Sequence, residues 1–246
     1  MSDASLDLLL DDLKLTKIKQ NYPAFSNEAA KTNKTMTAFL KSLVQEEHNH
    51  RIDSRIKRLI SQAKFPVVKT MTTFDFQSIP SLNKSQYLSL SECHFIDTAT
   101  NICLMGQTGT GKTHLAIALA YEACKKKIPT LFFSAAKLVN LFIDAQKNHQ
   151  LTLLQRKLFK AKLIVIDELG YIPFSKEGAE HLFQFFSETY ERQSVIVTSN
   201  LEFSDWTKFM GDSTMTSALL DRFTHHCEIL TLNGESYRFR QRKKRD

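Results

Sequence analysis

The spacing of apolar residues divides the chain into two parts. Up to about residue 70, apolar positions recur every three or four residues, as they do along one face of a helix. This pattern predicts a short helix over residues 5–20, which Pro23 stops, and a longer basic helix from about Met36 to Ala63, which Pro66 ends. Residues 1–70 are therefore expected to form a small all-helical N-terminal domain.

After residue 70, short β-branched or aromatic runs alternate with helical stretches. The runs that predict strands are residues 101–105, 130–133, 163–166, 195–198 and 228–232. Strands that are joined by helical crossovers form a parallel sheet, so residues 71–237 are expected to form an α/β domain with five parallel strands. A basic tail, residues 238–246, ends the sequence.

The composition is that of an ordinary globular protein, with 42% hydrophobic and 24% charged residues. Only 7 of 246 residues are glycine and 5 are proline, which argues against turn-rich sandwiches and propellers. No apolar run approaches the roughly 20 residues of a membrane span, and the acidic N-terminus does not resemble a signal peptide. We therefore expect a cytoplasmic protein with no membrane association.

Three of the seven glycines fall within six residues, which marks a candidate site. The segment Gly106-Gln107-Thr108-Gly109-Thr110-Gly111-Lys112-Thr113 fits the pattern G-x-x-x-x-G-K-[ST] between a predicted strand and a predicted helix. Backbone amides of such a loop curl around phosphates at the positive end of the helix. Lys112 is expected to reach the outer phosphates of ATP, and the Thr113 hydroxyl to ligate Mg²⁺.

A second set of polar residues follows two of the predicted strands. The apolar run 163–166 leads directly into Asp167 and Glu168, and the run 195–198 leads to Asn200. Ligands of parallel sheets gather where the strands end, so we expect these side chains beside the phosphate loop. Asp167 is expected to hold Mg²⁺ through water, Glu168 to act as the general base on the attacking water, and Asn200 to orient that water or contact the γ-phosphate.

Each of these residues also has a simpler interpretation. A glycine turn can precede any helix, an Asp-Glu pair can cap a helix or lie in a solvated turn, and an asparagine after a strand is usually a turn residue. The two matched motifs together favour ATP hydrolysis. A small-molecule kinase is a weaker alternative, because Glu168 after Asp167 suits activation of water better than transfer to a metabolite.

The cysteines and two adjacent histidines raise the question of a metal. Cys93, Cys103, Cys124 and Cys227 form no C-x-x-C pair, so we expect four reduced thiols. His225 and His226 directly precede Cys227, but no second pair of ligands at zinc spacing accompanies them in the sequence. Ordinary packing or hydrogen bonding is therefore expected for this group.

Charge is concentrated at the ends of the chain. The net charge is +7, made up of +4 over residues 1–70, −2 over 71–237 and +5 over 238–246. Basic flanks suggest a polyanionic partner such as double-stranded DNA, although a basic tail can also be only a solvated end. The candidate phosphate contacts are Arg51, Arg55, Lys57, Arg58, Arg238, Arg240, Arg242, Lys243, Lys244 and Arg245.

With these motifs in place, the chain resembles the IstB family of insertion-sequence ATP-binding proteins along nearly its whole length. These are AAA+ ATPases that assist a transposase and are related to DnaC helicase loaders. The segments that carry the resemblance are Phe74-Asp75-Phe76, residues 106–119, 166–171, 198–200 and 218–222, and Gly234-Glu235-Ser236-Tyr237-Arg238.

The resemblance implies an AAA+ core that forms homo-oligomers on duplex DNA in the ATP state, with ATP at subunit interfaces, and that passes target DNA to a cognate transposase. By the same resemblance, Arg222 matches the position of an arginine finger that reaches a neighbouring subunit's ATP, although a surface arginine more often forms a salt bridge. Only 14 residues follow Leu232, so no C-terminal lid is expected. Arg238 either replaces part of the lid's role or contacts DNA.

The sequence is also compatible with two other functions. A DnaC-like loader of a replicative helicase would share the same core and would bind its partner through the N-terminal helices. A protein that coats DNA and only binds ATP would also share the core, and phosphate release with and without duplex DNA distinguishes it from an ATPase.

Overall fold

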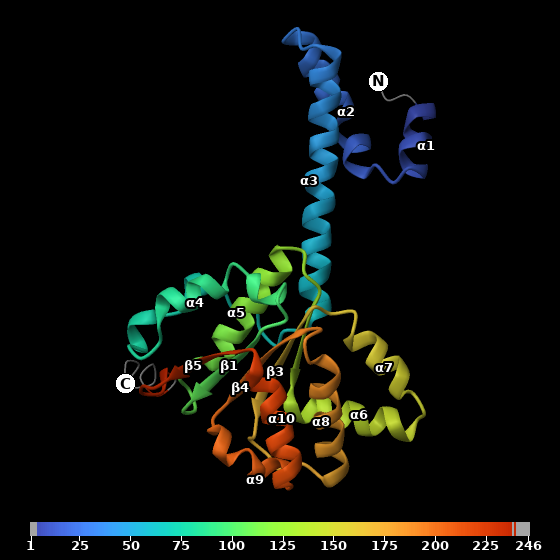
Figure 1. The fold of residues 1–246 in the computed structure, drawn as a ribbon. Coiled ribbons are helices and arrows are strands. Elements are labelled where there is room, and N and C mark those ends of the chain that lie inside the picture. Colours follow the sequence, from blue (N-terminus) through green and yellow to red (C-terminus); the bar gives the residue numbers. More distant parts are fainter. Residues whose placement is uncertain (1–3, 238, 240–246) are drawn as a thin grey trace. The chain divides into compact units, whose positions relative to one another are not determined.

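The computed structural model describes residues 4–237 and 239 of the chain (Figure 1). It divides into two compact units, Met1–Arg58 and Leu59–Asp246. The division falls inside one long helix, and the expected domain boundary near residue 70 stays a prediction. The six tail cations that the sequence suggests as DNA contacts, Arg238, Arg240, Arg242, Lys243, Lys244 and Arg245, lie outside the described residues.

The N-terminal unit is helical, but its first predicted helix is in fact two. Helix α1 spans Ala4–Asp12 and α2 spans Thr16–Lys31, with Lys14 between them in the left-handed conformation at φ 54°. Pro23 lies inside α2 and does not stop it, so the prediction of one helix ending before Pro23 is wrong.

The break between α1 and α2 has a cause that is distant in sequence. Helix α3 spans Met36–Ala63 and carries the buried Glu47. One oxygen of the Glu47 carboxylate accepts hydrogen bonds from the backbone N–H of Lys17 at 2.8 Å and of Ile18 at 3.3 Å. These amides belong to the first turn of α2, whose N–H groups have no partner within the helix, so Glu47 satisfies them from outside.

The second unit contains a five-stranded sheet in which every pair of neighbouring strands is parallel. The strands are β1 (Asn101–Gly106), β2 (Thr130–Ser134), β3 (Leu163–Leu169), β4 (Ser194–Ser199) and β5 (Cys227–Leu232). They lie in the order β2-β3-β4-β1-β5. The five predicted strands and their parallel arrangement are therefore confirmed, each to within three residues at its ends.

Helices connect and cover these strands (Figure 1). They are α4 (Lys84–Leu90), α5 (Lys112–Lys125), α6 (Ala135–Lys147), α7 (Leu151–Leu158), α8 (Lys176–Thr189), α9 (Thr207–Met210) and α10 (Ser213–His225). Single 3₁₀ turns lie at Met71–Thr73, Phe76–Ser78, His94–Ile96 and Phe203–Asp205. In the described residues that follow β5, no helical lid is present.

Two apolar layers hold the sheet because side chains alternate between its faces. On one face, Leu104 and Val165 pack with α5 and the segment before β1. On the other face, Ile164 and Val197 pack with α6, α8 and α10. The sheet is thus buried between helices on both sides, which explains why its strands read as continuous apolar runs.

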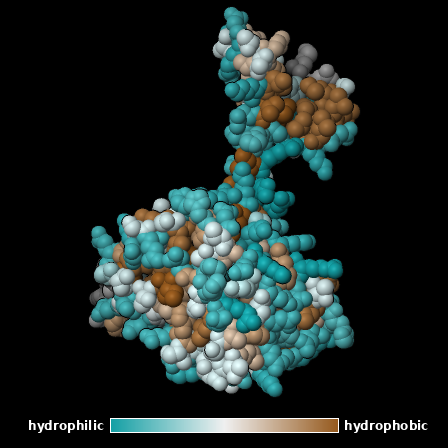
Figure 2. Space-filling model, viewed as in Figure 1, coloured by the Kyte–Doolittle hydropathy of each residue, from teal (hydrophilic) through white to brown (hydrophobic). Residues whose placement is uncertain are grey.

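Exposed apolar side chains gather on α1 and directly after it in the N-terminal unit. Leu8, Leu9 and Leu13 are each more than half exposed, and Figure 2 shows this region in brown. None of the helices in the described part of the chain is long and apolar enough to cross a membrane.

Candidate nucleotide-binding site

The phosphate loop joins the end of β1 to the start of α5, as predicted. Gly106 ends β1 at φ 147°, and a Cβ atom there would overlap the carbonyl oxygen of Leu232 on β5. Glycine is therefore required where the loop leaves the sheet. Thr110 is buried and its hydroxyl donates to the Gln107 carbonyl oxygen at 2.8 Å, which closes the loop on itself.

The ammonium group of Lys112 lies over this loop. Its Nζ donates to the carbonyl oxygens of Gly106 at 2.7 Å and Gln107 at 2.8 Å. Burial lowers the pKa of Lys112, while the nearby carboxylates of Asp167 and Glu168 act in the opposite direction. The positive charge is thus held between the loop and the two carboxylates.

Asp167 is connected to the phosphate loop by a short network of oxygens. Its Oδ1 accepts a hydrogen bond from the Thr113 hydroxyl at 2.8 Å and a second from the Thr198 hydroxyl at 2.5 Å. Strand β4 lies between β1 and β3, which places Thr198 between the loop and Asp167. The structure therefore brings the two predicted metal ligands, Thr113 and Asp167, into direct contact.

A bulge in β3 directs Glu168 outward. The pairing of β3 with β4 shifts between Ile166 and Leu169, and Glu168 has a left-handed φ of 61°. The Glu168 backbone N–H donates to the Thr198 hydroxyl at 2.9 Å. Positive φ at a residue other than glycine is strained and often accompanies function. The bulge leaves the Glu168 carboxylate exposed beside the buried Asp167.

Asn200 and Thr198 differ in their exposure and in their hydrogen bonds. Asn200 follows β4 directly and is exposed, and its side chain makes no hydrogen bond within the described residues. Its predicted role toward water or the γ-phosphate stays a prediction. Thr198 is 1% exposed and bonds to both Asp167 and Glu168, a role that sequence reasoning missed because a strand threonine carries no signal of its own.

Two further segments contact the phosphate loop, and both lie in motifs that carry the family resemblance. A Cβ at Gly111 would meet the ring of Phe74, and one at Gly109 would overlap the hydroxyl of Ser236. The Tyr237 backbone N–H donates to the Gly109 carbonyl oxygen at 3.0 Å. The sequence marks these segments as motifs but gives no sign that they flank the loop.

Arg222 lies on α10, three residues before the helix ends at His225 and five before β5 begins at Cys227. The phosphate loop and the start of β5 are at opposite ends of the parallel pair β1–β5. Its Nη1 donates to the Ala218 carbonyl oxygen at 2.7 Å, and its guanidinium carbon is 5.5 Å from the centre of the Phe183 ring. An open hollow beside it is lined by Ser213, Thr214, Ser217, Ala218 and Asp221.

The candidate DNA contacts on α3 are all exposed but are not equivalent. Arg51 forms an ion pair with Glu47 at 2.9 Å and donates to the Lys14 carbonyl oxygen at 3.0 Å. Arg55, Lys57 and Arg58 form no ion pair with any described residue. Arg51 therefore has a structural role inside the N-terminal unit, whereas the other three cations point to solvent.

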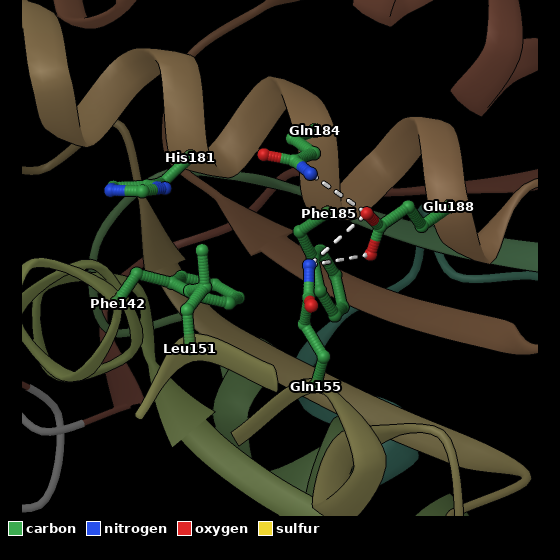
Figure 3. Close-up of a pocket in the computed structure, with 7 residues that line it drawn as sticks. All are labelled: Phe142, Leu151, Gln155, His181, Gln184, Phe185 and Glu188. Atoms are coloured by element: carbon green, nitrogen blue, oxygen red, sulfur yellow. Dashed lines mark hydrogen bonds between the residues drawn. The ribbon is translucent and has the colours of Figure 1, made fainter. Parts of the chain in front are cut away.

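A second hollow lies between α6, α7 and α8, away from the phosphate loop (Figure 3). Gln155 and Gln184 both donate to the carboxylate of Glu188, and the His181 ring stacks on Phe142 with centroids 5.7 Å apart. Figure 3 shows these residues facing one another across the hollow. Nothing in this lining resembles a phosphate site, so the candidate nucleotide site is the one at the sheet edge.

Comparison with solved structures supports the fold. The DnaC helicase loader matches over 60% of this chain and 86% of its own, with a TM-score of 0.53 and 20% identity. DnaI matches over 73% of this chain and 98% of its own, with a TM-score of 0.58 and 16% identity. AMPPCP-bound DnaA from Aquifex aeolicus matches over 74% of this chain and 55% of its own, with a TM-score of 0.57 and 19% identity.

Sequence comparison gives the family. A protein of insertion sequence IS21 from Pseudomonas aeruginosa, described as ATP-binding, is 34% identical over 97% of this chain and 90% of its own length. A protein of insertion sequence IS5376 from Geobacillus stearothermophilus, described in the same way, is 36% identical over 94% of this chain and 92% of its own length. The family model for IstB-like ATP binding proteins matches residues 8–245. With its phosphate loop, five-stranded parallel sheet and paired carboxylates, the chain belongs to the IstB-like ATP-binding protein family.

Proposed function

We propose that this protein hydrolyses ATP at the edge of its sheet and uses ATP to assemble on duplex DNA for a partner transposase. The observation that carries the ATPase proposal is the hydrogen bond between the Thr113 hydroxyl and Asp167 Oδ1. It joins the phosphate loop to the carboxylate pair and places two oxygen donors side by side. Mg²⁺ prefers such hard oxygen ligands, so Thr113 and Asp167 fit this ion.

The roles of the remaining residues follow from their positions. Lys112 binds the outer phosphates of ATP. Mg²⁺, when bound, would neutralise part of the negative charge of the phosphates. Glu168 is exposed next to Asp167, where its carboxylate can take a proton from an attacking water. Asn200, at the end of the neighbouring strand, orients that water or contacts the γ-phosphate.

Arg222 is proposed to complete the site of a neighbouring subunit. It precedes β5, which begins at the sheet edge opposite the chain's own phosphate loop, so it is poorly placed to act on its own ATP. The hollow beside it, lined by Ser213, Thr214 and Ser217, lies at the surface, where a neighbouring subunit can contact it. An arginine supplied in trans stabilises charge that develops during phosphoryl transfer. ATP would then lie at interfaces between copies of this chain.

DNA binding and transposition rest on charge and on the relatives. Arg55, Lys57 and Arg58 are exposed without ion pairs, and the basic tail adds cations that suit a phosphate backbone. The relatives that cover nearly the whole chain are proteins of insertion sequences. Loading of a replicative helicase is the second candidate, and its support is the likeness of the fold to DnaC and DnaI.

Phosphate release measured with Mg²⁺, with and without duplex DNA, tests the proposal. We expect DNA to stimulate release, and Lys112→Ala to abolish both release and ATP-dependent assembly, because the outer phosphates lose their fixed cation. Release that is absent from the unmodified chain under both conditions would leave only ATP binding. Co-purification with a replicative helicase, and not with the transposase, would favour the loader.

A further inference from the structure

The structure brings a third metal-binding side chain to the two adjacent histidines. Glu191 lies 34 residues before His225 in the sequence, in the turn between α8 and β4. Among residues 4–237 and 239, Glu191, His225 and His226 form the one group in which three possible ligand atoms lie within 4.8 Å of one another. We infer that this group is a binding site for a divalent transition metal, with Zn²⁺ the best fit.

The chemistry of the three donors suits zinc. Two imidazole nitrogens and one carboxylate oxygen are a common set of protein ligands for Zn²⁺, and a fourth position is left for water or another donor. His226 Nε2 is 3.9 Å from Glu191 Oε1. Bonds of about 2.0–2.2 Å around a tetrahedral ion require donors roughly 3.3–3.5 Å apart. All three side chains are exposed, so small rotations can bring the donor atoms to this spacing.

Tyr190 holds one of the ligands in place. Its hydroxyl is 3.0 Å from Nδ1 of His225. When Nδ1–H donates to that hydroxyl, the lone pair of Nε2 is free to bind a metal. Ligating histidines are commonly oriented in this way by a partner on the other ring nitrogen. In that tautomer, Tyr190 orients the His225 ring for metal binding.

The backbone that carries the ligands is also fixed. The His226 carbonyl oxygen accepts from the Asn101 backbone N–H at 2.7 Å, which anchors it to β1. On the other side, the backbone N–H groups of Arg192 and Gln193 both donate to the Thr189 carbonyl oxygen and close the turn around Glu191. A bound ion would thus join the end of α10, which carries Arg222, to the turn after α8.

Zn²⁺ titration of the untagged full chain against a chromophoric chelator, with millimolar Mg²⁺ present, tests this inference. Mg²⁺ in excess fills sites made of oxygen ligands alone, so the Zn²⁺ uptake that remains reports the site with histidine ligands. We expect one equivalent of Zn²⁺ per chain, together with a rise in the melting temperature. His226→Ala and Glu191→Gln should each weaken binding at least tenfold and remove the rise, and Tyr190→Phe should weaken binding about tenfold.

A matched control is available elsewhere in the same unit. His94 and Asp97 form an exposed pair whose Nδ1–Oδ2 distance is also 3.9 Å, but no third ligand joins it. His94→Ala should leave the affinity unchanged, as should Cys227→Ser. No stoichiometric uptake by the unmodified chain, or equal losses for His94→Ala and His226→Ala, would overturn the inference. ATP hydrolysis is not part of these readouts, so the inference stands or falls independently of the proposed function.

Discussion

One hydroxyl group, that of Thr198, links the carboxylate of Asp167 to the backbone of Glu168. It donates to Asp167 Oδ1 and accepts from the Glu168 backbone N–H, and it is buried. Asp167 Oδ1 accepts at the same time from Thr113. We therefore expect Thr198 to act as a positioning residue that holds the Glu168 backbone in place.

Replacing Thr198 with valine tests this role at nearly constant volume. The Glu168 N–H then loses its partner, at a cost of about 1–3 kcal/mol, and Asp167 loses a donor. We expect kcat for ATP hydrolysis to fall about 10- to 100-fold, since about 1.4 kcal/mol corresponds to a factor of ten, while KM changes little. Thr198→Ser keeps the hydroxyl and should restore most of kcat. Equal kcat for the valine and serine variants would show that the hydroxyl does not position the base.

Variants of Arg222 test whether one subunit completes the ATP site of its neighbour. Arg222→Ala should bind ATP normally but hydrolyse it poorly, and Lys112→Ala should do neither. Mixing the two should restore some hydrolysis, because an intact phosphate loop then meets an intact Arg222 across an interface. A mixture of Lys112→Ala with Glu168→Gln is the control, since neither subunit has a complete loop and base. Unimpaired turnover by Arg222→Ala alone would make Arg222 a structural residue.

At the scale of elements, Glu47 caps α2 from the neighbouring helix α3. Burial opposes its ionisation, but Arg51 and the backbone N–H groups of Lys17 and Ile18 outweigh burial, so the pKa of Glu47 is lowered. A folded-state pKa below the unfolded value stabilises the fold above that unfolded value of 4.5, and the stabilisation is lost as pH falls through the folded pKa.

Glu47→Gln should therefore loosen the junction between α1 and α2 at neutral pH. An uncharged side chain accepts more weakly from the two amides, and Arg51 loses its ion pair. Hydrogen exchange in the full chain should become faster at Lys17 and Ile18, while exchange in the sheet stays the same. In the unmodified chain, the same two amides should lose protection as the pH falls from 4.5 through the lowered folded pKa of Glu47. Unchanged exchange in the variant would contradict the capping role.

The sheet and the helices around it could be predicted, whereas the contacts between distant segments could not. Buried parallel strands leave long apolar runs, so residues 163–166 indicated a strand that the structure extends to Leu169. Residues 5–20 show one helical period, but Glu47 from another helix divides them. The phosphate loop was clear from its spacing, while Thr198 and Ser236 carry no local pattern that indicates their contacts.

At the scale of the whole molecule, the basic tail is expected to bind the DNA backbone. Removing residues 239–246 deletes five lysine and arginine residues. If each meets a phosphate, the slope of log affinity against log salt should fall by up to about 4 to 5 units per subunit, at about 0.9 per contact. The loss should be similar on all duplexes, because phosphate contacts do not read bases.

Two comparisons complete this test of the tail. ATP binding without DNA should survive the truncation, since the phosphate loop lies elsewhere in the chain. Arg51→Ala should change the salt slope less than Arg55→Ala, because Arg51 already pairs with Glu47. A truncated chain with unchanged affinity and salt slope would leave DNA contact to other residues.

We propose that Glu168 activates water for ATP hydrolysis, and the Glu168→Gln variant separates this role from ATP binding. Glutamine keeps the size of the side chain but cannot take the proton, and Thr113, Asp167 and Lys112 remain in place. The measurement is phosphate release on duplex DNA with Mg²⁺, together with ATP affinity. We expect ATP binding and assembly as in the unmodified chain, with phosphate release stopped. Release at the unmodified rate would contradict the assignment of Glu168 as the base.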